Sequence, residues 1–434
     1  MNIRLYNAKI LSMNADEDIF DGEIWIKDDK IVYVGDVNSG VFGSENEDIP
    51  LKQWDREIDC KGNLLMPGFK DAHTHSPMTF LRSYADDLPL DKWLNEKVFP
   101  NEEKLDGDSI RAFAKVAVLE YLHSGITGIF DMYLQPDVVG EVCEEMGMRC
   151  VLVSGLNNFT SSIEQTQKEY LRWNEPDSLI SYKLGFHAEY TCSRDLLIRL
   201  SELSHHYKAP VYCHLSETKK EVDECVSKYG MTPTVFLNSL GLFDFGGGGY
   251  HCVYMTGQDM DIFERRRLSV ITNPASNVKL ASGIAPIKDF LNRHIPVAIG
   301  TDGPASNNSL SLLKEMYLVS TLSKIRENDP AGIDALEIMK MATVNGSKAM
   351  GLRDSVCLER GQKADIVMID LNQPNMQPVN NIRKNIVYSA DDSNIKMTMI
   401  NGKILYYDGE YFVGEDPENI YKSANKLVKQ LLYS

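Results

Sequence analysis

Two histidines separated by a single residue follow an apolar run in the first fifth of the chain. The run spans residues 64–66, and His73 and His75 lie in the segment Pro-Gly-Phe-Lys-Asp-Ala-His-Thr-His-Ser-Pro-Met at 67–78. Side chains at i and i+2 of an extended segment point to one face, so the two imidazoles are expected to project together. Converging imidazoles can bind a divalent transition metal. The same spacing occurs in surface loops, so the rest of the chain has to decide between the two interpretations.

The middle of the chain alternates short apolar runs with helical patterns. The apolar runs span residues 64–69, 126–132, 150–155, 182–186, 210–213, 250–253, 268–272 and 296–300. Eight strands alternating with helices predict an α/β fold of the (β/α)8 TIM barrel type. A doubly wound open sheet is the alternative, but no Gly-x-Gly-x-x-Gly motif opens its first helix. The four glycines at 246–249 precede a predicted strand, so we interpret them as a flexible turn and not as a phosphate loop.

Both ends of the chain are rich in short strands. A hairpin with its turn at Asp28-Asp29 is predicted for residues 23–27 and 30–34. Near the other end, strand-like patterns occur at residues 364–369, 397–400 and 404–407. We therefore predict that residues 1–60 and 353–434 together form one small β-sandwich domain, and that residues 61–352 form the catalytic barrel. Asp416 and Pro417 are expected to cap and begin a final helix.

Composition excludes several classes of partner. The chain has 434 residues and a net charge of −17, which argues against a nucleic acid or an anionic membrane as partner because both need a basic face. The first 14 residues have no long apolar core, so we expect neither a signal peptide nor a membrane-spanning helix there. The eight cysteines contain no Cys-x-x-Cys pair and are expected to be reduced thiols of a cytoplasmic protein. The sequence leaves open whether the chain forms a homo-oligomer.

Histidines gather where a barrel carries its chemistry, at the C-terminal ends of the predicted strands. Five of the nine histidines follow or end such strands, and so does one aspartate: His73, His75, His187, His214, His251 and Asp302. We assign His73, His75, His214 and Asp302 as the ligands of one divalent metal, with zinc as the expected ion and iron as the alternative. Cys213 and Cys252 alternate away from their histidine neighbours and are expected to be packing thiols.

A single metal with an open position suits water activation, because it lowers the pKa of bound water from about 15.7 to about 7. A dinuclear site would need a bridging carboxylate or a modified lysine at the fourth strand, where Lys183 lies too early. Hydrolysis also needs a proton shuttle, and Glu217, three residues after His214, is the candidate. The alternative for Glu217 is a solvated loop carboxylate.

Longer motifs resemble those of the amidohydrolase superfamily over nearly the whole chain. The matching segments read PGFKDAHTHSPM, HLSETKKEV, NPASNVKLASGIAPI, GTDGPASNNSLSLLKEM and ADIVMID, in that order. Within the superfamily they resemble the branch of methylthioadenosine/S-adenosylhomocysteine deaminases and triazine chlorohydrolases. The resemblance implies a distorted barrel with a composite β-sandwich, one zinc or iron ion, and hydrolytic deamination of an aminopurine nucleoside.

The resemblance also implies roles for individual residues. His73, His75, His214 and Asp302 match the metal ligands, and Glu217 matches the proton shuttle that faces N1 of the purine. His187 matches a histidine that contacts the purine ring, and His251 matches one that orients the metal-bound water. Glu102 matches a glutamate that binds ribose hydroxyls, and Trp93 matches an aromatic wall of the pocket. Read alone, Glu102 would be a solvated helix start and Trp93 a core residue.

One segment departs from the family pattern. Relatives that accept S-adenosylhomocysteine carry arginines after the third strand, whereas residues 154–163 contain none here. A carboxylate is best held by a bidentate guanidinium, so methylthioadenosine, adenosine or 5'-deoxyadenosine is the favoured substrate. A hydrolase of guanine, an oxidised purine or a triazine on the same scaffold is the alternative. A catalytically inactive scaffold protein is disfavoured, because all four ligands and Glu217 are present.

Overall fold

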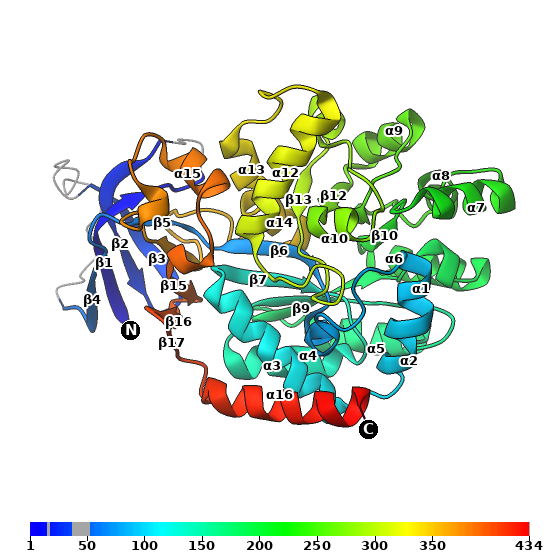
Figure 1. Ribbon diagram of the computed structural model, residues 1–434, viewed down its shortest axis with the longest axis horizontal. Helices are drawn as coiled ribbons and strands as arrows, with labels where there is room; N and C mark the ends of the chain where they lie inside the picture. The colour runs from blue at the N-terminus through cyan, green and yellow to red at the C-terminus, as the bar shows by residue number, and fades with distance from the viewer. Residues whose placement is uncertain (15–17, 37–52, 434) are drawn as a thin grey trace.

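The computed structural model describes residues 1–14, 18–36 and 53–433. Its centre is an eight-stranded parallel sheet with the strand order β13-β12-β11-β10-β9-β8-β7-β6, which curls into a barrel (Figure 1). The strands are β6 (Phe69–Thr74), β7 (Ile126–Asp131), β8 (Cys150–Val153), β9 (Ile180–Gly185), β10 (Val211–Leu215), β11 (Gly247–His251), β12 (Ser269–Thr272) and β13 (Val297–Ile299). The predicted barrel is therefore confirmed.

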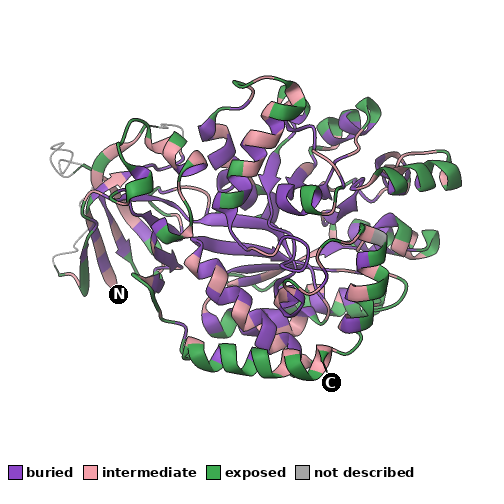
Figure 2. Ribbon diagram, in the orientation of Figure 1, coloured by how far each residue is buried: buried purple, intermediate pink, exposed green. Residues whose placement is uncertain are grey.

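Helices surround this barrel and leave its strands buried, as Figure 2 shows. They are α1 (Leu90–Lys92), α2 (Phe99–Glu102), α3 (Gly107–His123), α4 (Pro136–Met146), α5 (Ile163–Trp173), α6 (Arg194–Tyr207), α7 (Lys219–Tyr229), α8 (Pro233–Ser239), α9 (Gly257–Arg266), α10 (Pro274–Lys279), α11 (Ile287–Asn292), α12 (Leu312–Glu327), α13 (Ala335–Met341) and α14 (Val344–Met350). Six of the barrel strands contain only buried residues, as expected for parallel strands covered on both faces: β6, β7, β8, β10, β11 and β13.

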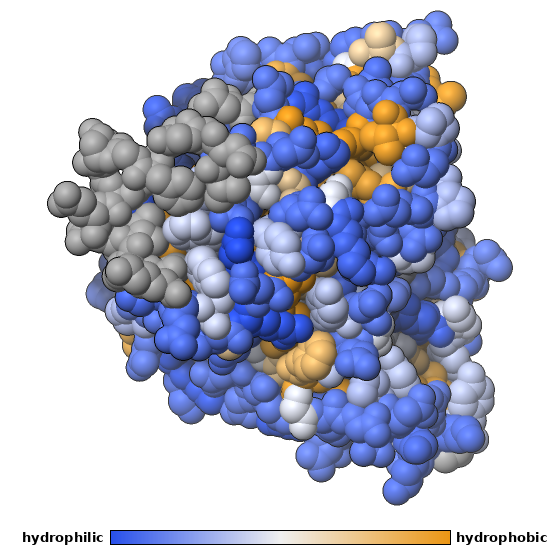
Figure 3. Space-filling view, turned by 90° about the vertical axis from the view of Figure 1, so that its left-hand side faces the viewer, coloured by the Kyte–Doolittle hydropathy of each residue, from blue (hydrophilic) through white to orange (hydrophobic). Residues whose placement is uncertain are grey.

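The two chain ends build a second, mixed sheet. Its strands are β1 (Asn2–Ile10), β2 (Phe20–Lys27), β3 (Lys30–Gly35), β4 (Arg56–Asp59), β5 (Leu64–Pro67), β14 (Ile366–Ile369), β15 (Ile395–Ile400), β16 (Lys403–Tyr407) and β17 (Glu410–Tyr411). N-terminal and C-terminal strands meet where β5 pairs antiparallel with β14. The end of the molecule that carries this sheet has a mostly hydrophilic surface (Figure 3). The prediction of one β-domain built from both termini is therefore confirmed.

The apolar run at 64–69, predicted as one barrel strand, is divided between the two sheets. β5 belongs to the sheet of the termini, and β6 opens the barrel. The backbone changes partners at Gly68, whose N–H donates to the carbonyl oxygen of Asp365, whereas the N–H of Phe69 donates to Gly125. Continuous hydrophobicity predicted burial correctly but could not reveal this change of sheet.

The glycine run at 246–249 is not the flexible turn that the sequence suggested. Gly247, Gly248 and Gly249 lie inside β11. A Cβ atom on Gly247 would lie 1.9 Å from the carbonyl oxygen of Val211, and one on Gly248 would lie 2.4 Å from that of Ser269. The glycines are required because the backbones of β10 and β12 approach β11 this closely.

The final helix, α16 (Pro417–Leu432), packs along α3 on the outside of the barrel (Figure 1). Asp416 caps it by accepting a hydrogen bond from the N–H of Glu418 at 3.0 Å, which confirms the predicted start. No helix in the described part of the chain is sufficiently long and apolar to cross a membrane.

Candidate metal centre

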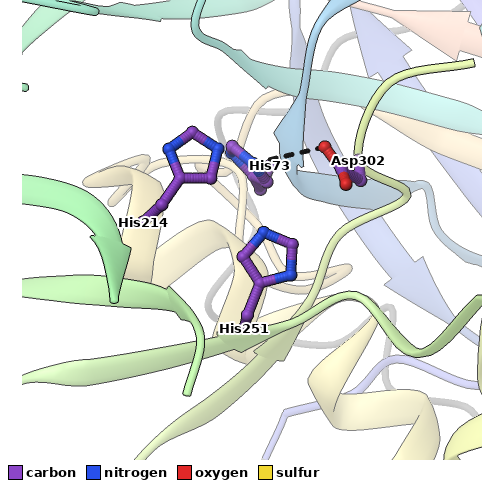
Figure 4. A group of neighbouring side chains, drawn as sticks. All are labelled: His73, His214, His251 and Asp302. Carbon is purple, nitrogen blue, oxygen red and sulfur yellow. Dashed lines mark ion pairs between the residues drawn. The ribbon is translucent and has the colours of Figure 1, made fainter. Parts of the chain in front are cut away.

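Four buried side chains from four barrel strands or their ends converge at one point. His73 lies in β6, His214 in β10, His251 at the end of β11 and Asp302 just after β13. One ligand atom from each lies within 4.8 Å of those of the other three, and Figure 4 shows the three imidazoles and the carboxylate around a common space. Parallel strands of a barrel end on the same rim, which is why residues so far apart in sequence meet here.

His75 approaches the same point from the turn after β6. Its Nε2 lies 3.4 Å from Nε2 of His214 and 3.2 Å from Oδ1 of Asp302, while Nε2 of His73 lies 3.6 Å from that oxygen. Two donors on a tetrahedral zinc ion, each at about 2.0–2.1 Å, are about 3.3 Å apart. These three separations within the predicted set of His73, His75, His214 and Asp302 are close to those of a mononuclear site.

Three of the imidazoles are oriented by oxygen acceptors on their outer side. Nδ1 of His214 donates to the carbonyl oxygen of His187 at 2.7 Å, and Nδ1 of His75 donates to that of Met132. Nδ1 of His251 donates to the side-chain oxygen of Asn277 at 2.8 Å. Such bonds select the tautomer in which Nε2 carries a free lone pair, as metal-binding histidines require.

His73 is a buried residue whose two ring nitrogens lack hydrogen-bond partners in the described part of the chain, and a bound ion could take the place of one. The side chain is completely buried, and neither ring nitrogen has a hydrogen-bond partner among the described residues. Its ring stacks on Tyr250 with centroids 3.7 Å apart. Burial, together with the nearby charge of His75, lowers the pKa of His73 well below its usual value, so the ring is neutral. A buried polar atom without a partner costs about 1–3 kcal/mol, and a bound ion would remove that cost. The cluster thus fits a single divalent metal ion.

Asp302 is held by groups that the sequence prediction missed. Its Oδ1 accepts the N–H of Gly303 at 2.8 Å, and its Oδ2 accepts the hydroxyls of Ser276 at 2.5 Å and Ser306 at 3.0 Å. Both serines lie in conspicuous Pro-Ala-Ser segments, so a signal for them existed. Their side chains satisfy the outer lone pairs and leave the inner edge of the carboxylate toward the histidines.

Glu217 lies beside the cluster, buried and not solvated as the alternative interpretation required. Its Oε1 accepts the hydroxyl of Ser282 at 3.1 Å, and its Oε2 is 3.9 Å from Nε2 of His251. Burial raises the pKa of Glu217, so the carboxyl group holds a proton more readily than an exposed glutamate. A carboxyl group with these properties is suited to proton transfer.

Comparison with known proteins agrees with this geometry. The amidohydrolase family profile matches residues 64–405, which is most of the chain. The chain belongs to the amidohydrolase family. Its 5-methylthioadenosine/S-adenosylhomocysteine deaminase relative from Thermoanaerobacter pseudethanolicus is 36% identical over the full length of both chains. The 5'-deoxyadenosine deaminase of Methanopyrus kandleri is also 36% identical, over 88% of this chain and 90% of its own.

Solved structures share this amidohydrolase architecture. An adenosine deaminase from Xanthomonas campestris with bound zinc superposes with a TM-score of 0.91 at 28% identity, covering 99% of this chain and 98% of its own. An atrazine chlorohydrolase from Arthrobacter aurescens, 22% identical, shares the fold with a TM-score of 0.86, covering 98% of this chain and 100% of its own. The family resemblance and the distorted barrel inferred from the sequence are confirmed.

Two of the three predicted substrate contacts of this amidohydrolase lie near the cluster. The ring centroid of His187 is 4.8 Å from that of His214. Glu102 ends α2, where burial raises its pKa and the nearby Tyr133 hydroxyl and His75 charge oppose that rise. Trp93, by contrast, is 5% exposed and packs in the main hydrophobic core, in agreement with its interpretation as a core residue. Its role as a pocket wall stays a prediction.

Aromatic residues around His187 were missed in the sequence. The rings of Phe99 and Tyr190 lie edge-on to it, with centroids 6.4 and 6.1 Å away. Both remain partly exposed, Phe99 at 37% and Tyr190 at 42%. Exposed aromatic rings next to a buried polar cluster are typical of a ligand-binding mouth. Phe99 follows Trp93 by six residues, so it lies close in sequence to the aromatic residue that the resemblance indicated.

Proposed function

We propose that the protein is a metal-dependent hydrolytic deaminase of adenosine-type nucleosides. The observation that carries this proposal is the buried Glu217 beside a histidine and aspartate cluster, in a chain 36% identical over its whole length to a 5-methylthioadenosine/S-adenosylhomocysteine deaminase. The reaction would convert the aminopurine and water into the inosine analogue and ammonia.

His73, His75, His214 and Asp302 would hold the ion. Nitrogen and carboxylate donors in this number suit zinc, with iron as the alternative. When bound, the ion supplies a Lewis acid that lowers the pKa of a coordinated water to about 7. The neutral state of His73 and His214, whose pKa values burial holds well below the usual range, leaves their nitrogens ready to bind without first losing a proton.

Glu217 would move the protons of the reaction. Its carboxyl group donates a proton to N1 of the purine and accepts one from the water whose oxygen bonds to C6, and it passes the accepted proton to the amino group. The C6–N bond breaks, ammonia leaves, and the proton remaining on the C6 oxygen returns to Glu217 as the carbonyl forms. Ser282 holds one carboxyl oxygen of Glu217, which leaves the other free for this transfer. Nε2 of His251, whose ring is held by Asn277, would orient the water.

Glu102 and His187 would bind the remainder of the nucleoside. A carboxylate at Glu102 can accept hydrogen bonds from both ribose hydroxyls, and His187 can contact the purine ring. The rings of Phe99 and Tyr190 flank His187 and offer an apolar surface to the substituent at the 5' carbon. Apolar contact of this kind favours a methylthio group or a hydrogen over a charged tail.

The segment 154–163 after β8 contains no arginine that could bind the carboxylate of a homocysteine tail. The loop after β8 carries Asn157, Asn158 and the exposed Phe159, whose relative exposure is 83%. Arg172, the cation that could have folded inward, instead forms ion pairs of 2.8 Å with Asp137 and 2.9 Å with Glu141. Losing a charge-assisted hydrogen bond, worth about 1.5–3 kcal/mol, lowers specificity by about one to two orders of magnitude.

A panel of nucleosides and bases, scored by ammonia release from the purified enzyme, tests this proposal. We expect methylthioadenosine and 5'-deoxyadenosine to exceed S-adenosylhomocysteine in kcat/KM by at least tenfold, and adenine to be much poorer than adenosine. The Glu217→Gln variant, prepared identically, controls for contaminating deaminases. Release of ammonia from guanine, or of chloride from a chlorotriazine, with no reaction of any adenosine would contradict the proposal and favour the alternative hydrolase.

A further inference from the structure

We propose that Glu221 is a positioning residue that holds the proton shuttle Glu217 through its backbone. The inference rests on the proposed function of Glu217 and adds a residue outside the predicted site. Glu221 lies in the first turn of α7, four residues beyond Glu217, and is 5% exposed. It touches no member of the histidine cluster, so its effect must pass through the loop between β10 and α7.

The carboxylate of Glu221 accepts hydrogen bonds from consecutive backbone N–H groups of that loop. Its Oε1 accepts the N–H of Ser216 at 2.6 Å, and its Oε2 accepts those of Glu217 at 2.8 Å and Thr218 at 3.5 Å. The Thr218 hydroxyl in turn accepts the N–H of Glu221 at 3.2 Å. An ordinary capping box accounts only for the bonds with Thr218. The two shorter bonds, to Ser216 and Glu217, go beyond what the helix requires.

The loop needs this support because its backbone is unusual. Ser216 has a φ of +50°, in the left-handed region that a residue with a side chain adopts only when its surroundings hold it there. On the opposite side, the carbonyl oxygen of Ser216 accepts the N–H of Tyr254 at 2.9 Å. Glu221 and Tyr254 thus fix the N–H and C=O sides of one short segment, and Glu217 projects from it toward His251.

The pair of oxygens on Glu221 is essential to this arrangement. A glutamine has the same shape but offers one acceptor oxygen and one NH₂ donor, so either Ser216 or Glu217 would face another donor. The Glu221→Gln variant should release the backbone of Glu217 without removing bulk from the core. Such a change displaces the shuttle and leaves the metal ligands in place.

The test uses the full-length, metal-loaded enzyme and its Glu221→Gln variant. We expect kcat to fall at least tenfold with KM within about twofold, and bound metal to stay at one equivalent. Hydrogen exchange at the amides of Ser216 and Glu217 should accelerate at least tenfold. Two variants serve as controls: Glu224→Gln on the exposed face of α7, and Asp259→Asn, which disrupts the capping box of α9. Neither should change exchange at Ser216 and Glu217 or kcat by more than twofold.

A double-variant cycle separates positioning from a merely structural role. If Glu221 acts through Glu217, adding Glu221→Gln to Glu217→Gln causes no further loss of kcat. The proposal would be overturned if the loss of kcat in the double variant equalled the product of the two single-variant losses. Unchanged hydrogen exchange at Ser216 and Glu217 in Glu221→Gln would also overturn it. Absence of deaminase activity in the wild type would refute the proposed function alone, because the exchange measurement still decides whether Glu221 holds the loop.

Discussion

The carboxylate of Asp71, in the first barrel strand, binds Thr301, the residue immediately before the predicted metal ligand Asp302. Asp71, fully buried in β6, accepts the backbone N–H of Thr301 at 2.8 Å and its hydroxyl at 2.6 Å. The backbone N–H of Asp302 donates to the carbonyl oxygen of His73 at 2.9 Å. β6 and β13 are the two ends of the barrel sheet, so these bonds hold two of the predicted ligands together where the barrel closes.

Replacing Asp71 by asparagine should weaken both the fold and the metal site. The amide can accept only one of the two bonds from Thr301 and turns a donor toward the other. We expect the free energy of unfolding to fall by about 1–3 kcal/mol, measured by urea denaturation, and a chelator to remove the metal faster. The exposed Asp108→Asn variant is the control. Unchanged stability and metal release would show that Asp71 does not support the site.

His75 and His251 differ in their expected roles, and metal analysis separates them. His75→Asn should lose the ion on dialysis, because its Nε2 has the separations of a ligand. His251→Asn should keep about one equivalent per chain and lose turnover, because it is assigned to orient water. Elemental analysis of both purified variants is the measurement. Metal lost only from His251→Asn would make His73, His214, His251 and Asp302 the ligand set, and two equivalents in the wild type would refute a mononuclear site.

Glu217→Gln should bind metal normally and be nearly inactive. The amide cannot carry a proton between water and the purine, and general acid–base catalysis contributes about 10² to 10⁴-fold to the rate. We expect kcat to fall by that factor, measured with the best substrate of the panel. A decrease smaller than about tenfold would assign proton transfer to another group.

Glu102→Ala should remove the preference for nucleosides over bases. In the wild type, a partly buried carboxylate without its ribose partners costs about 1–3 kcal/mol, which disfavours adenine. The variant should lose kcat/KM for adenosine and change little for 2',3'-dideoxyadenosine, which lacks both hydroxyls. Equal losses of kcat/KM for the two nucleosides would show that Glu102 does not bind the ribose hydroxyls.

A buried ion pair between the two sheets should make the fold sensitive to acid. Asp365, just before β14, accepts Nε of Arg149 at 2.7 Å and its Nη2 at 3.1 Å, and Nζ of Lys70 lies 3.8 Å away. Burial alone would raise the pKa of Asp365, but the charges of Arg149 and Lys70 outweigh it and hold the pKa well below its usual value. The folded state therefore binds a proton at Asp365 less readily than the unfolded chain does.

The sign of the pH effect follows from this difference. The stabilisation by Asp365 is complete above the unfolded pKa of about 3.9 and is lost as the pH falls toward the lower folded value. Urea denaturation between pH 3 and 7 should show a steeper acid loss in the wild type than in Asp365→Asn. At neutral pH, Arg149→Met should cost about 3–5 kcal/mol, because it leaves a buried carboxylate without its main partner. Parallel acid profiles of wild type and Asp365→Asn would contradict this assignment.

The sequence alone was sufficient for features that are local or repeated. Strand and helix periodicity predicted the barrel and the sheet of the termini, since each strand had to be buried whatever its neighbours were. The histidines at strand ends predicted a metal site, because parallel barrel strands bring their ends to one rim. The capped start of α16 and the hairpin around Asp28 depended on neighbouring residues only.

Tertiary structure decided everything that depends on distance between remote segments. The exchange of backbone partners at Gly68 separated β5 from β6, and close packing against Val211 and Ser269 turned a presumed glycine turn into a strand. Three serine hydroxyls and one further carboxylate show their roles only through their contacts with Asp302 and Glu217. These groups belong to Ser276, Ser282, Ser306 and Glu221. Hydrogen bonds act over about 3 Å, and residue spacing along a chain does not define distances on that scale.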